Sequence, residues 1–414
     1  MILPAIQVRI AFDSEPFAEI PIWTDVTADA VSFSTRRGRQ KQLDRIECGV
    51  ATLTLTNSSG NYWPSNTGGA YYPNIKPWKR INIRATYSGA TYDIFTGFIE
   101  AWRPTWAGTG GMVPMMQLTC ADLQKSFSLC NLNDVSGYSV EKSGARIDNV
   151  LDDIGWPHVA TADYWKLGTS SLDIDTILAY RDRFTDTGQS SIQASGALEN
   201  VNAMEHIYSV IQTEMGTFYI GTDGNPKFQD RYARLKEPYL TSQATFGDDN
   251  GENHYHVLNP SYDDSDIYND IRLTRAGGTE QVASDATSQS DYGIRTLARN
   301  NLLMTTDGEA LDQSNYLKGQ YANPSLSFKR MDIYPMRDPD DLFPKVLSYD
   351  ISTRITLRLN QASIDQDYHI EGINHQYDTN KSAWVTQWQL SDADTQTYWV
   401  LGTSTLGTTT RLAY

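Results

Sequence analysis

The sequence feature that most constrains the fold is a pattern of strands that occurs near both ends of the chain. Each occurrence contains three segments of alternating residues, in the same order and at a nearly constant distance along the chain. The matching segments are Arg80–Ile83 with Arg354–Leu357, Tyr92–Ile99 with Tyr368–Asn374 (Gly97 over Gly372), and Gln117–Thr119 with Gln389–Ser391. Agreement in both order and spacing predicts a duplicated β domain. The alternative is that alternating strands resemble one another without a common origin.

Residues 1–130 are predicted to form the first copy, a compact all-β domain in the form of a partly closed barrel. Val50–Thr56 alternates apolar residues with threonines, which favours a strand with one wet face. Arg80–Tyr87 and Tyr92–Trp102 alternate in the same way and are predicted to pair as antiparallel strands. Met112–Cys120 completes the set.

An aromatic loop follows the strand Val50–Thr56. The turn residues 57–60 end the strand, and two aromatic pairs follow, Tyr62–Trp63 and Tyr71–Tyr72. Large aromatics in a loop are expected to pack against the end of the barrel or against an adjoining subunit. The alternative is that these rings stack on sugars, as in a cell-wall binding module.

Residues 131–236 are predicted to form an α+β domain with two helices and a hairpin. Ser143 can cap a helix that runs to Ile154, and a second helix is predicted over Ala197–Met215. Asp223-Gly224, within Thr217–Arg231, is a strong hairpin signal. Gly168–Gln193 is polar and is predicted as a loop.

The rest of the chain is predicted to hold the second copy and an insertion. Ile267–Arg275 is taken as the first strand of the second copy, and a helix is expected near Asp307–Tyr321. The fold class is therefore mainly β with an α+β middle: two similar small β-barrel domains separated by a helix-containing domain. The C-terminal divisions are the second barrel over 237–275 and 325–395, a helical insertion over 276–324, and an extension over 396–414.

The charge balance limits the partners. With 34 Lys+Arg against 50 Asp+Glu, the net charge is -16 and the pI is about 4.8. An acidic surface repels phosphate, so we expect no sequence-specific binding of nucleic acid. The one notable basic cluster, Arg36–Arg45, is predicted to be a solvated loop beside a strand.

Cysteine content and hydropathy indicate synthesis in a reducing cytoplasm. Cys48, Cys120 and Cys130 are too few and too scattered for a disulfide framework. The segment 1–15 lacks the basic start and unbroken apolar run of a signal peptide. No run of about 18 apolar residues occurs, so we expect no membrane insertion.

Two groups of residues have some of the features of metal sites. His254 and His256 share one face of a predicted strand near Asp248–Asp249, but no third ligand stands at a known spacing. Three aspartates within Asp263–Asp266 lack the EF-hand spacing and its closing glutamate, and a solvated turn is the expected structure. We therefore predict no metal and no cofactor.

No catalytic residues are predicted either. The sequence has no Gly-x-Ser-x-Gly elbow and no glycine loop that would cradle a phosphate. A glycosidase needs two facing carboxylates, and among 50 acidic residues nothing selects one pair over another. The chain is therefore expected not to be an enzyme.

Several segments together resemble a known family. The order of DRIECGVATLTLTNSSGNYWPSN (44–66), RINIRATY (80–87) and YDIFTGFIEAW (92–102) is similar to the opening domain of tail-hub proteins of tailed bacteriophages, which include the baseplate hub of contractile tails. The TFYIGTDGNPKFQDR hairpin, SDIYNDIRLTR (265–275) and the duplicated barrel also fit, and the resemblance reaches about Leu390. The segment beyond Ser391 has no place in the family pattern.

The resemblance implies a homotrimeric ring with pseudo-sixfold symmetry that joins a sixfold tail tube to a threefold tip and lets DNA pass. The implied partners are the tail tube or distal tail protein, the tape measure protein, and tip or fibre proteins. The implied location is the tail tip of the virion, and the host cytoplasm during assembly. Two alternatives stay open: a carbohydrate-binding module or glycoside hydrolase, and a distal tail ring protein, which would be hexameric with one such β domain.

Overall fold

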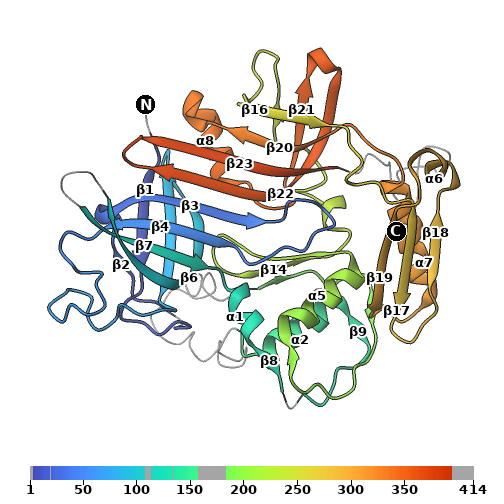
Figure 1. Cartoon of the computed structure of the whole chain (residues 1–414), viewed down its shortest axis with the longest axis horizontal. Coiled ribbons are helices and arrows are strands. Elements are labelled where there is room, and N and C mark those ends of the chain that lie inside the picture. Colours follow the sequence, from blue (N-terminus) through green and yellow to red (C-terminus); the bar gives the residue numbers. More distant parts are fainter. Residues whose placement is uncertain (1–2, 19, 108–112, 134, 157–182, 394–414) are drawn as a thin grey trace.

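The computed structural model describes residues 3–18, 20–107, 113–133, 135–156 and 183–393 (Figure 1). The fold is mainly β, as the sequence predicts, and the α-helices of the described residues lie between Gln124 and Ser348. The predicted extension over 396–414 and most of the predicted loop Gly168–Gln193 lie outside the described residues.

Within the described residues, thirteen strands from both ends of the chain form one sheet. The strands along it are β2 (Thr24–Asp25), β1 (Ala5–Ile10), β5 (Arg80–Tyr87), β6 (Ala90–Ala107), β7 (Val113–Ala121), β4 (Val50–Thr56), β3 (Ala30–Gly38), β22 (Ile364–Asp378), β23 (Ala383–Asp392), β20 (Ser327–Ile333) and β16 (Val257–Ser261). Off this path, β21 (Arg354–Leu359) pairs with β22, and β15 (Thr245–Phe246) pairs with β21. No pairing among these residues closes the sheet on itself. The predicted barrels are therefore corrected to two open β units that share one sheet.

The two β units have the same strand order. In the N-terminal β unit, made of β3 to β7, the order across the sheet is β5-β6-β7-β4-β3. In the C-terminal β unit, made of β16 and β20 to β23, it is β21-β22-β23-β20-β16. Every neighbouring pair in both units is antiparallel. The segments near Ile81 and Ile355 thus occupy the same place in two copies of one topology.

A β-bulge fixes how the two copies correspond residue by residue. The ladder between β6 and β7 skips Glu100, and the ladder between β22 and β23 skips Glu371. Two residues before each bulge, Phe98 pairs with Arg80 and His369 pairs with Arg354. Glu100 therefore corresponds to Glu371, and the predicted overlay of the second strands is displaced by four positions. A displacement by an even number keeps the alternation of faces, so the sequence pattern alone does not reveal it.

The insertion contains a sheet of its own, which corrects the predicted first strand of the second copy. The segment Ile267–Arg275 holds β17 (Asp270–Arg275), which pairs with β18 (Gln281–Ser284) and β19 (Thr296–Leu302) instead of joining the C-terminal β unit. The first strand of that unit is β16. Helix α6 (Ala286–Tyr292) follows β18, and the predicted helix near Asp307–Tyr321 is α7, with the same bounds.

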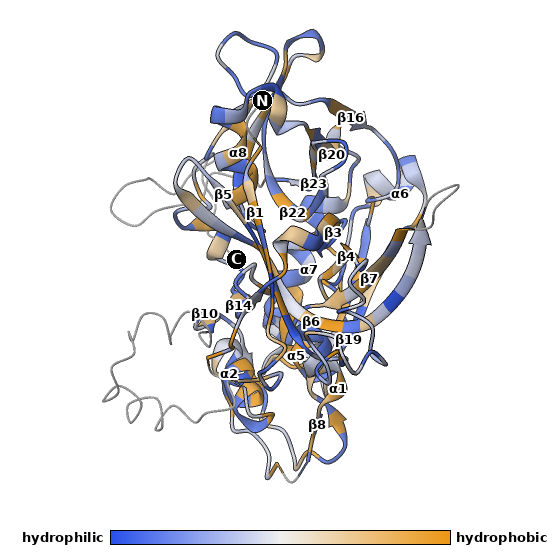
Figure 2. Ribbon diagram, turned by 90° about the vertical axis from the view of Figure 1, so that its left-hand side faces the viewer, coloured by the Kyte–Doolittle hydropathy of each residue, from blue (hydrophilic) through white to orange (hydrophobic). Residues whose placement is uncertain are grey.

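The middle of the chain packs two main helices against short strands. Its elements are α1 (Gln124–Leu129), β8 (Asn131–Leu132), β9 (Glu141–Lys142), α2 (Ser143–Asp153), β10 (Phe184–Thr185), β11 (Ser191–Ile192), β12 (Val201–Asn202), α5 (Ala203–Glu214), β13 (Thr217–Ile220) and β14 (Pro226–Gln229). Strands β13 and β14 form the predicted hairpin. Ser143 is the first helical residue of α2 instead of its cap, and α5 begins later than predicted because the Asn202 side chain accepts the Glu205 N–H at 3.1 Å. Apolar stretches of α2 are visible in Figure 2.

No helix in the described part of the chain is long and apolar enough to cross a membrane.

One hydrophobic core serves both β units, and one face of helix α8 (Pro339–Ser348) packs into it. Phe343 of α8 is fully buried. Its ring lies 5.1 Å from that of Tyr87 in the N-terminal β unit and 6.0 Å from that of Trp384 in the C-terminal β unit. Phe33 of β3 also meets Trp384, with the ring centroids 5.6 Å apart. The two units therefore depend on each other for burial.

Replacing Phe343 by Ala should lower the free energy of unfolding by about 3–5 kcal/mol, because the cavity would open between both units. Urea unfolding followed by intrinsic fluorescence measures the change. The control is Leu311→Ala on α7, where the side chain is 38% exposed and the expected change is within about 0.5 kcal/mol. Equal effects in the two variants would contradict a shared core at Phe343.

Candidate functional site

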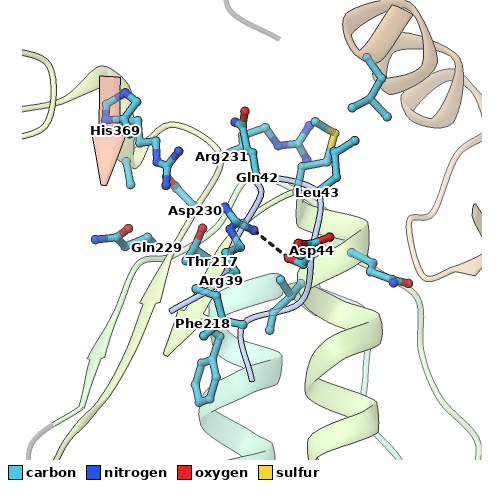
Figure 3. Close-up of a pocket in the computed structure, with 18 of the residues that line it drawn as sticks. Arg39, Gln42, Leu43, Asp44, Thr217, Phe218, Gln229, Asp230, Arg231 and His369 are labelled. Carbon is cyan, nitrogen blue, oxygen red and sulfur yellow. Dashed lines mark hydrogen bonds between the residues drawn. The ribbon is translucent and has the colours of Figure 1, made fainter. Parts of the chain in front are cut away.

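A pocket of about 180 Å³ lies where the two β units, the middle helices and the insertion meet (Figure 3). The loop after β3 forms one wall, and Arg39 in this loop donates a hydrogen bond to the Asp44 backbone oxygen at 3.2 Å. The end of α5 and the β13–β14 hairpin form another wall, and α7 contributes Tyr316 and Tyr321. The pocket therefore marks the junction of four parts of the chain.

Glu371, at the bulge of β22, is the central charge beside this pocket. Its side chain is fully buried. Arg39 Nε lies 2.7 Å from one carboxylate oxygen, and Arg234 Nη1 lies 2.6 Å from the other. Burial alone raises the pKa of Glu371, but the charges of Arg234 and Arg39 outweigh burial and hold the pKa well below its usual range. The carboxylate thus ties β22 to the loop after β3 and to the segment after β14.

A second buried carboxylate joins the middle domain to the insertion. Glu214, at the end of α5, is 3.2 Å from Arg231 Nε and accepts the Ser190 N–H at 2.7 Å. Burial raises the pKa of Glu214, but Arg231 and the hydrogen bonds outweigh it and lower the pKa overall. Arg231 also reaches Glu309 of α7 at 2.7 Å. A single arginine therefore bridges α5 and α7.

The basic run Arg36–Arg45 was predicted to be a solvated loop, and this holds only in part: Arg37 and Arg39 are largely buried, whereas Arg36 and Arg45 are exposed. Arg37 is only 6% exposed and donates to the Ile220 carbonyl at 2.9 Å. The acidic residues that pair with this run lie in distant parts of the sequence, so the pattern of the run does not predict them. Its ion pairs are Arg37 with Asp350 (3.0 Å), Arg39 with Glu371 (2.7 Å), Lys41 with Asp266 (2.8 Å) and Arg45 with Glu205 (2.9 Å).

His369 lines the pocket as a neutral side chain. Burial, with a smaller contribution from the charge of Arg234, lowers the pKa of His369 to about 3. Its Nδ1 lies 3.0 Å from the Ser352 carbonyl oxygen, which orients the ring. This histidine therefore contributes packing and a hydrogen bond at neutral pH. The pocket residues described here bind parts of the chain to one another.

Several of the residues weighed as metal ligands make other contacts in the structure. Asp248 and Asp249 accept hydrogen bonds from Asn360, and His256 packs edge-on against Tyr334, with the ring centroids 4.2 Å apart. Asp266 pairs with two lysines. Within the residues that the structure describes, no three His, Cys, Asp or Glu side chains gather as a metal site.

The aromatic loop divides into a buried and an exposed part. Tyr62 is buried and donates to Asp29 at 2.6 Å, and Tyr71 stacks on Phe12 with the ring centroids 4.1 Å apart. These two rings pack against the core of their own chain instead of being free to contact an adjoining subunit. Trp63 instead lies near the surface, 5.9 Å from the ring of Trp106 on β6.

Two strand edges of the β units are unpaired within the described residues. Beyond the Glu100 bulge, the segment Ala101–Ala107 of β6 pairs with β7 on one side only. Strand β16 pairs with β20 on one side only. The corresponding edges of β22 and β3 are paired with each other. Sequence reasoning missed these edges, because alternation indicates a strand without indicating its neighbours.

Replacing Glu371 by Gln should destabilise the fold by about 3–5 kcal/mol, because two largely buried guanidinium groups would lose their counter-charge. Its stabilising contribution is present above the ordinary carboxyl pKa of 4.5 and is lost as the pH falls through the depressed value of the folded state, so the variant should also show a weaker loss of stability on acidification below pH 4.5. Urea unfolding at several pH values measures both effects.

The control is Glu280→Gln, which breaks the exposed pair with Arg272. Its expected cost is at most about 1 kcal/mol. A Glu371 variant as stable as this control would contradict the role assigned to the buried carboxylate.

Comparison with known proteins was made for the whole chain. No protein-family model and no curated protein matches it. Among solved structures, it is similar to the 43 kDa tail protein of prophage MuSo2 from Shewanella oneidensis, with a TM-score of 0.57 and 12% identity over 94% of this chain and 98% of that one. It is also similar to a tail protein from Neisseria meningitidis MC58, with a TM-score of 0.59 and 9% identity over 94% and 97%. The chain therefore has the fold of these tail proteins over nearly its whole length.

Proposed function

We propose that this chain is a structural protein of a phage-type tail, a hub whose three copies form a ring between the tail tube and the tip. The observation that carries the proposal is the occurrence of two β units with one strand order in a single chain. The fold shared with two tail proteins over nearly their whole length supports it. The division of the chain into domains follows the same proposal, with the two β units as the ring-forming parts.

The duplication gives a reason for a trimer. Three copies of a chain with two similar units present six similar units around an axis. Such a ring offers sixfold features to a tail tube on one face and threefold features to a tip on the other. The proposed partners are a tail tube or distal tail protein, a tape measure protein, and tip or fibre proteins, in the tail of a virion assembled in the host cytoplasm.

The charge supports passage of DNA without binding. A net charge of -16 makes an acidic lumen possible, and an acidic wall repels the phosphate backbone. The basic run Arg36–Arg45 offsets this only slightly, because four of its five basic residues, Arg37, Arg39, Lys41 and Arg45, form ion pairs within the chain. We assign no catalytic, metal or cofactor role to the described residues.

The proposal predicts the mass of three chains in native mass spectrometry, either alone or after mixing with a tail tube protein. Rings should appear in negative-stain images, and the tube protein should co-purify with the trimer. A monomer that fails to bind the tube protein and instead binds or hydrolyses peptidoglycan would contradict the hub.

Trp63→Ala should weaken assembly by about tenfold in dissociation constant, because a half-exposed ring beside the free edge of β6 would lose its contact area. Sedimentation at several concentrations measures the effect. Tyr292→Ala on α6, also an exposed aromatic, is the control and should assemble normally. Normal assembly of the Trp63 variant would show that the loop is not part of the interface.

A further inference from the structure

We propose that the Ala101–Ala107 segment of β6 in one copy pairs antiparallel with β16 of a neighbouring copy, as β22 pairs with β3 inside one chain. The inference rests on the proposed ring and names the strands that would build it. It follows from comparing the two β units residue by residue.

The two units correspond through one row of residues that crosses four strands. Trp102 of β6 and Ile373 of β22 each stand two residues beyond their bulge. From these positions, the residues that lie opposite one another on neighbouring strands run through the equivalent strands in the same order. The rows are Trp102–Leu118–Leu53–Phe33 in the N-terminal β unit and Ile373–Trp388–Met331–Leu258 in the C-terminal β unit.

Inside the chain, one junction between units is complete. Beyond the Glu371 bulge, β22 leaves β21 and pairs with β3 from Gly372 to Asp378. The equivalent segment of β6 has no such partner in the described residues, and neither has the outer edge of β16, the equivalent of β3. Each copy thus has both strands of a second, incomplete junction: the Ala101–Ala107 segment of β6 and the outer edge of β16. Two different edges that complement each other form a head-to-tail contact, which closes into a ring when the rotation allows it.

The correspondence fixes the register of the proposed pairing. Tyr377, six residues beyond Glu371, pairs with Phe33 and covers its ring at 5.3 Å between centroids. Trp106 stands six residues beyond Glu100, and Leu258 is the equivalent of Phe33. Trp106 should therefore cover Leu258 of the neighbouring copy. This contact would bury a tryptophan that is 54% exposed in the single chain.

Both free edges carry a proline, Pro104 in β6 and Pro260 in β16. Proline lacks the N–H of a ladder and is typical of edges that must not pair indiscriminately. The pairing between copies would have fewer hydrogen bonds than the pairing of β22 with β3. Side-chain contacts such as that of Trp106 with Leu258 would then decide which edges meet.

A disulfide test follows from the register. Arg103 is the equivalent of Asn374, three residues beyond the bulge. Antiparallel strands run in opposite directions, so the residue three positions before Trp106 on β6 lies opposite the residue three positions after Leu258 on β16, which is Ser261. Arg103 should therefore face Ser261 of the next copy, as Asn374 faces Arg36 inside the chain.

The Arg103→Cys/Ser261→Cys double variant, oxidised at high concentration with and without a tail tube protein, should give cross-linked chains that stop at three. The matched control, Arg36→Cys/Asn374→Cys, should form its bond within one chain and stay at the mass of one chain on a denaturing gel. Each single variant should remain unlinked, and the native cysteines Cys48, Cys120 and Cys130 are present in every variant.

If the protein is trimeric in native mass spectrometry but the Arg103→Cys/Ser261→Cys variant stays unlinked while the control links, the pairing is overturned and the hub is left standing. Cross-linked chains that continue beyond three would support the pairing and contradict the closed ring. Monomers without a cross-link at every concentration, with or without the tube protein, would contradict both.

Discussion

The structure depends on the pairing of β22 with β3, because this ladder turns two β units into one sheet with one core. The pairing is possible only where β22 leaves β21, and the bulge at Glu371 is the point of departure. The extra residue of a bulge bends a strand and increases its twist, which brings the second half of β22 alongside the other unit. Burying a carboxylate at this bend would be costly alone, but Arg39 and Arg234 reach it from two other parts of the chain. Backbone geometry and charge therefore act at the same residue.

The two copies keep the bulge and differ in what its side chain does. Glu100, the equivalent of Glu371, is partly exposed and reaches Lys125 at 3.3 Å. Of these two equivalent bulges, only the one at Glu371 has arginines, Arg39 and Arg234, paired with its carboxylate. This difference fits a chain in which one junction is permanent and its counterpart is left open until another copy arrives. It also explains why the fold holds largely buried ion pairs at the meeting point of its parts while the whole chain stays strongly acidic.

The sequence predicts what is local and misses what depends on distant partners. Helix α7, helix α2 and the β13–β14 hairpin follow from periodicity and an Asp-Gly turn, and the repeated strands follow from their spacing. The register of the repeat was wrong by four residues in the second strand, because a two-residue period is unchanged by an even shift. The strand within Ile267–Arg275 was recognised, but alternation does not say which sheet a strand joins. The partial burial of the run Arg36–Arg45 was missed because the carboxylates that pair with it lie far away in the sequence. The free edges of β6 and β16 can be recognised only when all the neighbours of each strand are known.

The central claim is that the junction of β22 with β3 is repeated between copies. Amide hydrogen exchange, read by mass spectrometry in the monomer and in the assembled ring, tests it most directly. The account predicts slow exchange over Phe33–Arg37 in both states, and slowing over Ala101–Ala107 and Val257–Ser261 only in the ring. A ring in which these two edges exchange as fast as they do in the monomer would contradict it.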